Sequence, residues 1–346
     1  MSDLRSHRLR SHRLTAPARS VSDAAQHLLA VQAQDFIAGR WALGVRSRGP
    51  VTLADVDAAF AGGELVRAWT MRGTLHIIPT RDLQWVLSVT APRQRQQAAG
   101  RHRELGIDGE MVVAALRALR PALVDGGCTR AEAFDRFESV GIDPSAQRGI
   151  HLLFTFTIDG EICQGPVVAS DGITREQRIV ATADAVSESV RPEDPLAELF
   201  VRYIDGHGPA GERDFAWWSG LTLTTAREAV ERARGRVREV DAGVFTALRA
   251  PRRSLADSTV FALPAFDEYY ISYADRTAVC AAQHLDAVGP GKNGMVRPTL
   301  VEAGRVVGTW SHAAAARDTP VQLFEGGEDG EPVASALARF ALFADD

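Results

Sequence analysis

The sequence predicts an α+β fold in which tandem winged-helix (helix-turn-helix) units are followed by a C-terminal β-barrel-like domain. The order helix, helix, β-hairpin occurs near the N-terminus, recurs along the chain, and gives way to β-rich segments with glycine turns. No strict sequence repeat accompanies it, so the repetition is one of element order only. The expected parts are 1–108, a winged helix with a basic N-terminus; 109–190 and 191–254, two further winged helices; and 255–346, the β-barrel-like domain.

Two helices are expected in the first unit. The segment 22–34, SDAAQHLLAVQAQ, has apolar residues at helical spacing and Ser22 in the N-cap position. A second helix begins at Thr52, where Thr52 and Asp55 resemble a capping box with aspartate in place of glutamate, and the glycine pair after AAFA ends it. The basic N-terminal repeat RSHRLRSHRL either extends the first helix or forms a flexible arm.

A hairpin completes the first unit, and the same order then recurs. The β-prone runs VRAWTM and TLHIIP flank Arg72-Gly73, which predicts a hairpin ending at Pro79. In the second unit, Thr129 and Glu132 form a full capping-box match that opens one helix, and a further helix runs through HLLFTF.

The remaining elements follow from turn signals. Asp159-Gly160, between β-prone segments, predicts the hairpin of the second unit. From Asp194, the runs LAELFVRYIDGHG, ERDFAWWSG and LTTAREAVERARG predict helices, and VREVDAGVFTAL predicts the strands of a third unit. A late hairpin is expected around Ala303-Gly304, followed by a strand and a closing helix.

Charge is distributed unevenly along the chain. The net charge is −5, but residues 1–120 carry 17 basic and 10 acidic residues, a net of +7. This asymmetry suggests a face for a polyanion, and chance clustering is the alternative. The N-terminus lacks the apolar stretch of a signal peptide, and no apolar run approaches the ~18 residues of a membrane span. Three widely spaced cysteines, Cys128, Cys163 and Cys280, indicate unpaired thiols in a reducing cytoplasm.

The segment VQAQDF contains two glutamines, Gln32 and Gln34, at the end of the first predicted helix. In a helix, side chains two residues apart point in different directions, whereas in an extended segment they share a face. The pair can therefore act together only if the helix ends or distorts near Gln32. Otherwise Gln32 is a buried or capping residue and Gln34 is solvated.

Other side chains could carry chemistry. Asp267 and Glu268, in LPAFDEYYISY, are the best acid candidates, although a structural or electrostatic role is the alternative. His76 lies on the first predicted wing, where it either contacts DNA or packs in the core. Trp217 and Trp218 are expected to pack between helices, with base stacking as the alternative. No metal-binding or cofactor-binding motif is present, so no metal and no cofactor are expected.

Four segments, LLAVQAQD, RAWTMRGTLHIIP, LPAFDEYY and VRPTLVEAGRVVGTW, together resemble the AlkZ/YcaQ family of winged-helix DNA glycosylases. The resemblance implies tandem winged helices followed by a β-barrel. It also implies catalysis by a Gln-x-Gln motif in the AlkZ-like branch, which Gln32-Ala33-Gln34 matches. Asp35 lies one position too late for the Gln-x-Asp motif of the other branch.

The resemblance implies a monofunctional DNA glycosylase for cationic N7- or N3-alkylated purines, including bulky or interstrand-crosslink natural-product adducts, possibly in toxin self-resistance. The partner is double-stranded DNA that carries such purines, no membrane is involved, and the enzyme is expected to be a monomer in the cytoplasm, associated with the nucleoid. The chain has a single lysine, Lys292, and a mechanism through a Schiff base would need it or the N-terminal amine. Candidate DNA contacts are His76, Arg40, Arg72, Arg93, Arg95 and Arg297.

Two other functions are compatible with this sequence. Winged helices are often transcriptional regulators, which bind one DNA sequence tightly and have no catalytic activity. A resistance protein that sequesters a drug would bind the free compound without DNA. Neither alternative accounts for the position of the Gln32/Gln34 pair.

Overall fold

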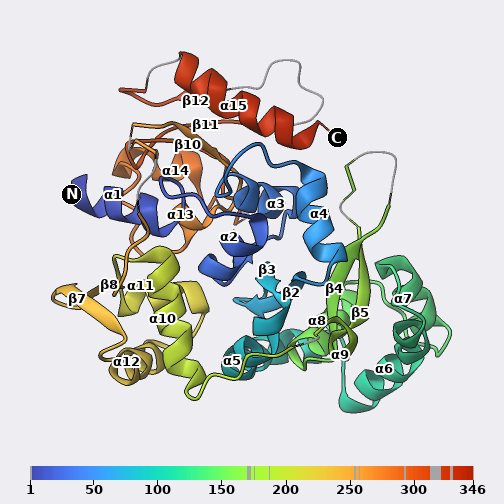
Figure 1. Ribbon diagram of the computed structural model, residues 1–346. Coiled ribbons are helices and arrows are strands. Elements are labelled where there is room, and N and C mark those ends of the chain that lie inside the picture. The colour runs from blue at the N-terminus through green and yellow to red at the C-terminus, as the bar shows by residue number, and fades with distance from the viewer. Residues whose placement is uncertain are drawn as a thin grey trace. The chain divides into compact units, whose positions relative to one another are not determined.

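The computed structural model describes residues 2–169, 173–174, 176–186, 188–252, 255–256, 258–291, 294–311, 321–327 and 330–345. The chain forms two compact units, one built from Met1–Val56 and Leu196–Asp346 and the other from Asp57–Pro195. Helices and sheets occur in both units (Figure 1), so the predicted α+β class is confirmed. The finer division into four parts stays a prediction.

The chain begins with five short elements, the last of which continues from the first unit into the second. They are α1 (Ser2–Ser11), α2 (Val21–Leu28), β1 (Val31–Gln32), α3 (Phe36–Gly44) and α4 (Leu53–Ala61). The basic N-terminal repeat is ordered rather than a flexible arm, because Arg8 lies 3.6 Å over the Tyr273 ring and donates to the Pro209 carbonyl. In α4, the backbone N–H of Thr52 and that of Asp55 each donate to the other's side chain, which is the predicted capping box.

The first predicted helix is wrong at both ends. Its N-cap is Ser20, whose hydroxyl accepts from the Asp23 amide, rather than Ser22. It ends at Leu28 instead of continuing to residue 34. The residues from Val31 to Gln34 are therefore not helical.

The rest of the first unit contains two groups of elements. The first is α10 (Pro195–His207), β6 (Ala210–Gly211), α11 (Glu212–Ser219), α12 (Leu223–Arg232), β7 (Val237–Asp241) and β8 (Val244–Ala247). These helices and strands follow the predicted order. Among the described residues, the strands form a small sheet in the order β6-β8-β7.

The second group contains β9 (Phe261–Leu263), α13 (Glu268–Ile271), α14 (Leu285–Val288), β10 (Thr299–Glu302), β11 (Arg305–Thr309), β12 (Gln322–Leu323) and α15 (Glu331–Ala344). The predicted turn is present, since Ala303 and Gly304 both have positive φ, 47° and 73°, and join β10 to β11. The described strands form an antiparallel sheet in the order β12-β11-β10-β9 and do not close into a barrel, so the predicted β-barrel-like character of this part stays a prediction.

The second unit combines a sheet with helices. Its elements are β2 (Leu65–Met71), β3 (Thr74–Pro79), α5 (Leu83–Glu104), α6 (Gly109–Val124), α7 (Arg130–Glu138), α8 (Arg148–Ile158), β4 (Ile162–Val167), β5 (Gln177–Ala181) and α9 (Thr182–Ala185). The strands of this unit run in the order β3-β2-β4-β5. The β2–β3 hairpin turns at Arg72 and Gly73, with φ of 54° and 68°, as predicted. The capping box of Thr129 and Glu132 is also confirmed.

The second predicted hairpin is wrong. Asp159 is the C-cap of α8, and Gly160 follows it with φ of 77°, so this pair ends a helix instead of joining two strands. The strand that follows, β4, pairs with β5. Phe137, Leu152 and Trp69 belong to the apolar core beneath these helices.

The three cysteines are free and buried. Burial raises the pKa of the Cys163 thiol to about 12 and that of the Cys280 thiol to about 11. Burial also raises the pKa of Cys128, with a further contribution from Glu132. Within the described ranges, no helix is both long and apolar enough to span a bilayer.

Candidate functional site

A strained turn separates the glutamine segment from α2. Leu29 has φ of 67° and ψ of −52°, and the Ala30 amide donates to the Leu28 carbonyl at 2.9 Å. This geometry is that of the γ-turn with positive φ, which is rare because it strains a residue that has a Cβ. The turn ends α2 and directs the chain into β1.

The tripeptide Gln32-Ala33-Gln34 is fixed at both ends. Gln32 is 8% exposed and Ala33 is fully buried, whereas Gln34 is exposed. After the tripeptide, Asp35 is the N-cap of α3, and its carboxylate accepts from the Ile37 and Ala38 amides. The segment thus lies between a γ-turn and a helix N-cap, which satisfies the condition under which the two glutamines can act together.

Glu268 holds the backbone of this segment. The Gln32 N–H donates to Oε1 of Glu268 at 2.7 Å. The other oxygen, Oε2, accepts from the Trp218 indole at 3.2 Å and from the Ser272 hydroxyl, and His207 Nε2 lies 3.6 Å away. Glu268 is completely buried, so its carboxylate is surrounded by donors and shielded from water.

The helix that carries Glu268 is itself anchored. Asp267 is the N-cap of α13 and accepts from the Tyr269 amide at 2.9 Å. The guanidinium of Arg46 donates two hydrogen bonds to the Asp267 carboxylate. Phe266, just before it, has φ of 58°, a strained value for a residue with a Cβ. Of the two predicted acids, Asp267 is therefore neutralised by Arg46, and Glu268 contacts the glutamine segment.

The two tryptophans of α11 hold opposite ends of α13. Trp218 is buried and bonds Glu268, as described above. Trp217 is 45% exposed and donates its indole N–H to the Ile271 carbonyl at 2.8 Å. Trp218 therefore agrees with the predicted packing role, whereas Trp217 contacts α13 from the surface instead of the core. The guanidinium of Arg276 lies 5.0 Å from the Trp217 ring.

Buried histidines and tyrosines pack beside Glu268. His12 Nε2 lies 2.7 Å from the Tyr273 hydroxyl, which donates to the His207 carbonyl. Burial, together with the positive charges around it, lowers the pKa of His12 well below its usual value. Burial and then Arg13 lower the pKa of His27 to about 3. Both imidazoles are therefore neutral at physiological pH.

The predicted DNA contacts lie in different environments. Arg40, in α3, is fully buried with its guanidinium 4.2 Å over the Phe36 ring, so it offers no surface charge to a phosphate. Arg297 is exposed and lies just before β10. His76, Arg72, Arg93 and Arg95 all belong to the second unit. Sequence position alone did not distinguish the buried arginine from the exposed one.

His76 is a buried, bonded residue of β3. Its Nδ1 lies 3.1 Å from the Thr74 carbonyl, which can only accept, so we assign the proton to Nδ1. Nε2 then accepts from the Arg72 guanidinium at 3.4 Å. The hydroxyl of Thr70 is also within 3.0 Å of Nδ1. His76 thereby positions Arg72 at the tip of the β2–β3 hairpin.

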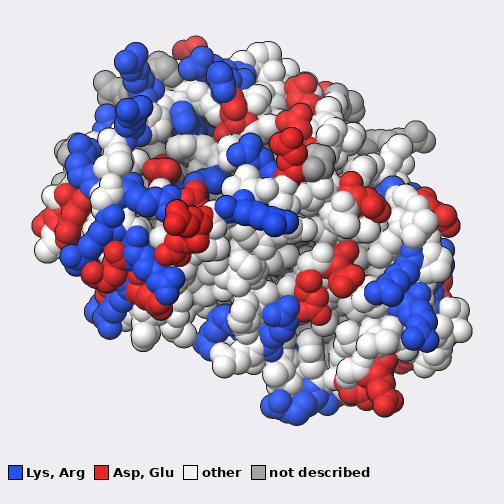
Figure 2. All heavy atoms as spheres, turned by 60° about the horizontal axis from the view of Figure 1, so that its bottom comes forward, with Lys and Arg blue, Asp and Glu red and all other residues white. Residues whose placement is uncertain are grey.

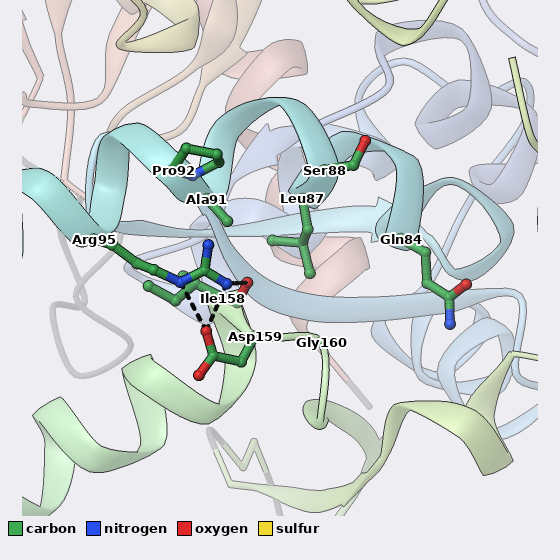
Figure 3. Close-up of a pocket in the computed structure, with 9 residues that line it drawn as sticks. All are labelled: Gln84, Leu87, Ser88, Ala91, Pro92, Arg95, Ile158, Asp159 and Gly160. Atoms are coloured by element: carbon green, nitrogen blue, oxygen red, sulfur yellow. Dashed lines mark hydrogen bonds and ion pairs between the residues drawn. The ribbon is translucent and has the colours of Figure 1, made fainter. Parts of the chain in front are cut away.

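Arg95 lines a surface pocket of about 300 Å³ between α5 and the end of α8 (Figure 3). Its guanidinium bonds Asp159 at 2.6 Å across this pocket. Arg93 bonds Gln96 at 3.0 Å. The positive charge of Arg95 is thus already paired, whereas the partner of Arg93 is neutral.

Burial removes part of the basic charge of the N-terminal third from the surface. On the face in Figure 2, basic and acidic side chains are interspersed. Several arginines of residues 1–120 are buried and contribute nothing to the surface: Arg8, Arg40, Arg46 and Arg67. The net charge of +7 over residues 1–120 therefore overstates the basic surface. In the part of the chain that the structure describes, no group of three or more His, Cys, Asp or Glu side chains is placed to hold a metal.

Comparison with known proteins identifies the family. A family profile described as "DNA glycosylase AlkZ-like" matches residues 25–343. A curated relative, the interstrand DNA cross-link repair glycosylase of Streptomyces sahachiroi, is 25% identical over 312 residues, which cover 84% of this chain and 82% of the relative.

The solved structure of Streptomyces sahachiroi DNA glycosylase AlkZ is similar in fold. It gives a TM-score of 0.79 at 22% identity and covers 99% of this chain and 96% of that one. Together with the family profile, these matches favour the glycosylase over the predicted alternative of a regulator. The chain belongs to the AlkZ-like family of DNA glycosylases.

Proposed function

We propose that this glycosylase hydrolyses the N-glycosidic bond of cationic N7- or N3-alkylated purines in double-stranded DNA, with Gln32 and Gln34 as its catalytic residues. The observation that carries the proposal is the conformation of the glutamine segment. Because α2 ends at Leu28, the two glutamines lie at alternate positions of a non-helical stretch. Gln32 ends the strand β1 and Gln34 follows in a bend, so the two side chains are no longer separated by the turn of a helix, and we infer that both amides reach one substrate.

The chemistry suits neutral amides. Alkylation makes the purine cationic, so when the C1′–N9 bond breaks, its electron pair neutralises the ring and no acid is needed to protonate the leaving base. The sugar develops oxocarbenium character, which the partial negative charge of two amide oxygens stabilises. A water molecule held by these oxygens attacks C1′ and loses its proton to solvent. The products are the free alkylated purine and an abasic site.

We propose a monofunctional enzyme, because hydrolysis by water needs no amine nucleophile. The one lysine that a Schiff-base mechanism could use, Lys292, lies outside the described residues. The curated relative is named for interstrand cross-link repair, which supports bulky or crosslinking adducts as substrates. Self-resistance to a toxin belongs to the proposal as an inference from the family resemblance. The same proposal includes winged-helix units and an open surface for such DNA. It also includes a monomeric state and a cytoplasmic, nucleoid-associated location.

The proposed DNA contacts are Arg72, Arg93, Arg95 and Arg297, with His76 acting through Arg72. Arg297 and Arg95 are exposed, as a phosphate contact requires. Arg95 would have to exchange its bond to Asp159 for one to a phosphate. The burial of Arg40 excludes it from this group.

The test is single-turnover excision from a duplex containing one N7-methylguanine, with abasic sites revealed by alkaline cleavage. Wild-type protein is compared with Gln32→Ala, Gln34→Ala and the double variant. Gln283→Ala, which alters an exposed glutamine of the same unit, is the matched control. We expect loss of excision with DNA binding retained in the first three variants, and normal excision in the control.

A wild-type protein that releases neither N7-methylguanine nor a crosslinked base would contradict the proposed substrates. Excision that survives in the double variant would contradict the catalytic assignment alone. The same assay on a duplex with an unmodified guanine should give no product, because the neutral base is a poor leaving group.

A further inference from the structure

We propose that Glu268 is a positioning residue for the glycosylase reaction, which holds the backbone of Gln32 and places a negative charge behind the catalytic segment. This inference rests on the proposed function of Gln32 and Gln34. It concerns a residue 236 positions away in the sequence, on α13.

The contact is direct and charge-assisted. The Gln32 amide donates to Oε1 of Glu268 at 2.7 Å, which is short for an N–H···O bond and typical of an ionised acceptor. Since Gln32 is the last residue of β1, this bond fixes the backbone at the point from which the Gln32 side chain projects. Rotation of that peptide would move the side-chain amide oxygen of Gln32 away from a bound sugar.

A carboxylate is a costly choice for holding one backbone amide. Glu268 is completely buried, and burying a carboxylate costs several kcal/mol unless hydrogen bonds compensate. A backbone carbonyl or an amide side chain could accept the same bond without that cost. The structure instead surrounds Oε2 with the Trp218 indole and the Ser272 hydroxyl, two donors that favour the ionised form of a carboxyl group.

The reaction supplies a reason to retain this charge. Positive charge develops on the sugar as the C1′–N9 bond breaks, and a fixed negative charge nearby is worth more in a buried, low-dielectric setting than in water. The bond that the Gln32 N–H donates to Glu268 also places this charge directly against the backbone of the proposed catalytic residue. Strained residues flank both partners, Leu29 before β1 and Phe266 before α13, as is common where a fold holds a site against its local preference.

The central experiment compares Glu268→Gln with wild type in single-turnover excision of N7-methylguanine and in duplex affinity. Glutamine keeps the size and one acceptor oxygen but removes the charge. We expect the rate constant to fall about tenfold or more with affinity within about twofold. Glu331→Gln, an exposed glutamate of the same unit, is the matched control and should behave as wild type.

A second measurement follows the contact itself. In protein labelled with ¹⁵N-glutamine, the Gln32 amide proton should resonate far downfield in wild type and move upfield in Glu268→Gln. Trp218→Phe and Ser272→Ala loosen the carboxylate without removing it, and they serve if Glu268→Gln does not fold. Across these variants, the excision rate should fall as the Gln32 amide proton moves upfield. If Glu268 had a purely structural role, the variants would lose stability, but the excision rate would not follow the amide shift.

The outcomes separate the two proposals. Full activity of Gln32→Ala contradicts the proposed function and the positioning role with it. Inactive Gln32→Ala with fully active Glu268→Gln contradicts the positioning role alone. An amide proton that moves in Trp218→Phe and Ser272→Ala while their excision rates stay at the wild-type value also overturns it.

Discussion

Arg46 and Asp267 form an ion pair with two hydrogen bonds, 2.8 Å from Nη1 to Oδ2 and 2.7 Å from Nη2 to Oδ1, and both side chains are completely or almost completely buried. The pair joins the segment after α3 to the first turn of α13. It therefore ties the chain that follows the glutamine segment to the helix that carries Glu268.

Replacing Arg46 with methionine should destabilise the protein by about 3–5 kcal/mol, because a buried Asp267 charge is left without a partner. The measurement is the free energy of unfolding in denaturant. The double variant Arg46→Met/Asp267→Ser removes the charge while serine keeps the N-cap, so it should be more stable than the single variant. A double variant that is less stable than Arg46→Met would contradict this account.

At the γ-turn of Leu29, a glycine variant should be more stable than an alanine variant, which is the reverse of the usual order inside a helix. Leu29→Ala and Leu29→Gly both lose a buried side chain, but glycine also relieves the strain of a positive φ. Leu29→Gly should therefore be the more stable of the two, by about 1 kcal/mol. At Leu28, inside α2 and equally buried, alanine should be the more stable, which provides the matched control. If alanine is more stable than glycine at both positions, Leu29 is not strained.

Acid should destabilise the first unit through His27. Its pKa is lowered from 6.5 to about 3 on folding, so between these values the unfolded chain binds a proton that the folded chain does not. Stability from this residue is thus fully present above pH 6.5 and falls as the pH decreases towards 3. The loss at pH 5 is about 2 kcal/mol.

The free energy of unfolding at pH 8 and pH 5 tests this effect. His27→Gln should show a smaller difference between the two values than wild type. Leu28→Val, which alters no titratable group, should lower both values equally. An unchanged pH dependence in His27→Gln would show that another group controls it.

Arg297→Ala should weaken binding to any duplex, modified or not, because a phosphate contact carries no sequence information. The slope of log affinity against log salt should become shallower by about one unit, as expected for one lost phosphate contact. Arg297→Lys keeps the charge and should keep most of the slope. Binding titrations at several salt concentrations distinguish these results, and an unchanged slope in Arg297→Ala removes this residue from the DNA contacts.

Local chemistry made part of the fold predictable. The turns at Arg72-Gly73 and Ala303-Gly304 are confirmed. They could be predicted because a two-residue hairpin turn needs positive φ angles, which glycine adopts readily. The capping box of Thr129 and Glu132 is confirmed because its two hydrogen bonds are local. The hairpin predicted at Asp159-Gly160 is wrong because a glycine with positive φ ends a helix as readily as it forms a hairpin turn.

The site was harder to predict. No sequence signal marks Leu29, because leucine rarely adopts a positive φ, and so the end of α2 at Leu28 could not be foreseen. The glutamine pair and Glu268 were both candidates in the sequence, but their contact depends on tertiary packing. The available sequence signal was that LLAVQAQD, which contains the glutamine pair, and LPAFDEYY, which contains Glu268, are both among the segments that resemble the family.

The buried cysteines have a consequence for the proposed role in a cell that contains alkylating agents. Compounds that alkylate guanine in DNA also attack thiolates, which are far stronger nucleophiles than neutral thiols. Cys128, Cys163 and Cys280 are all buried with raised pKa values, so almost none of their sulfur is ionised or accessible at neutral pH. The folded protein can therefore remain chemically intact in a cell whose DNA is being alkylated, and partial unfolding would end this protection.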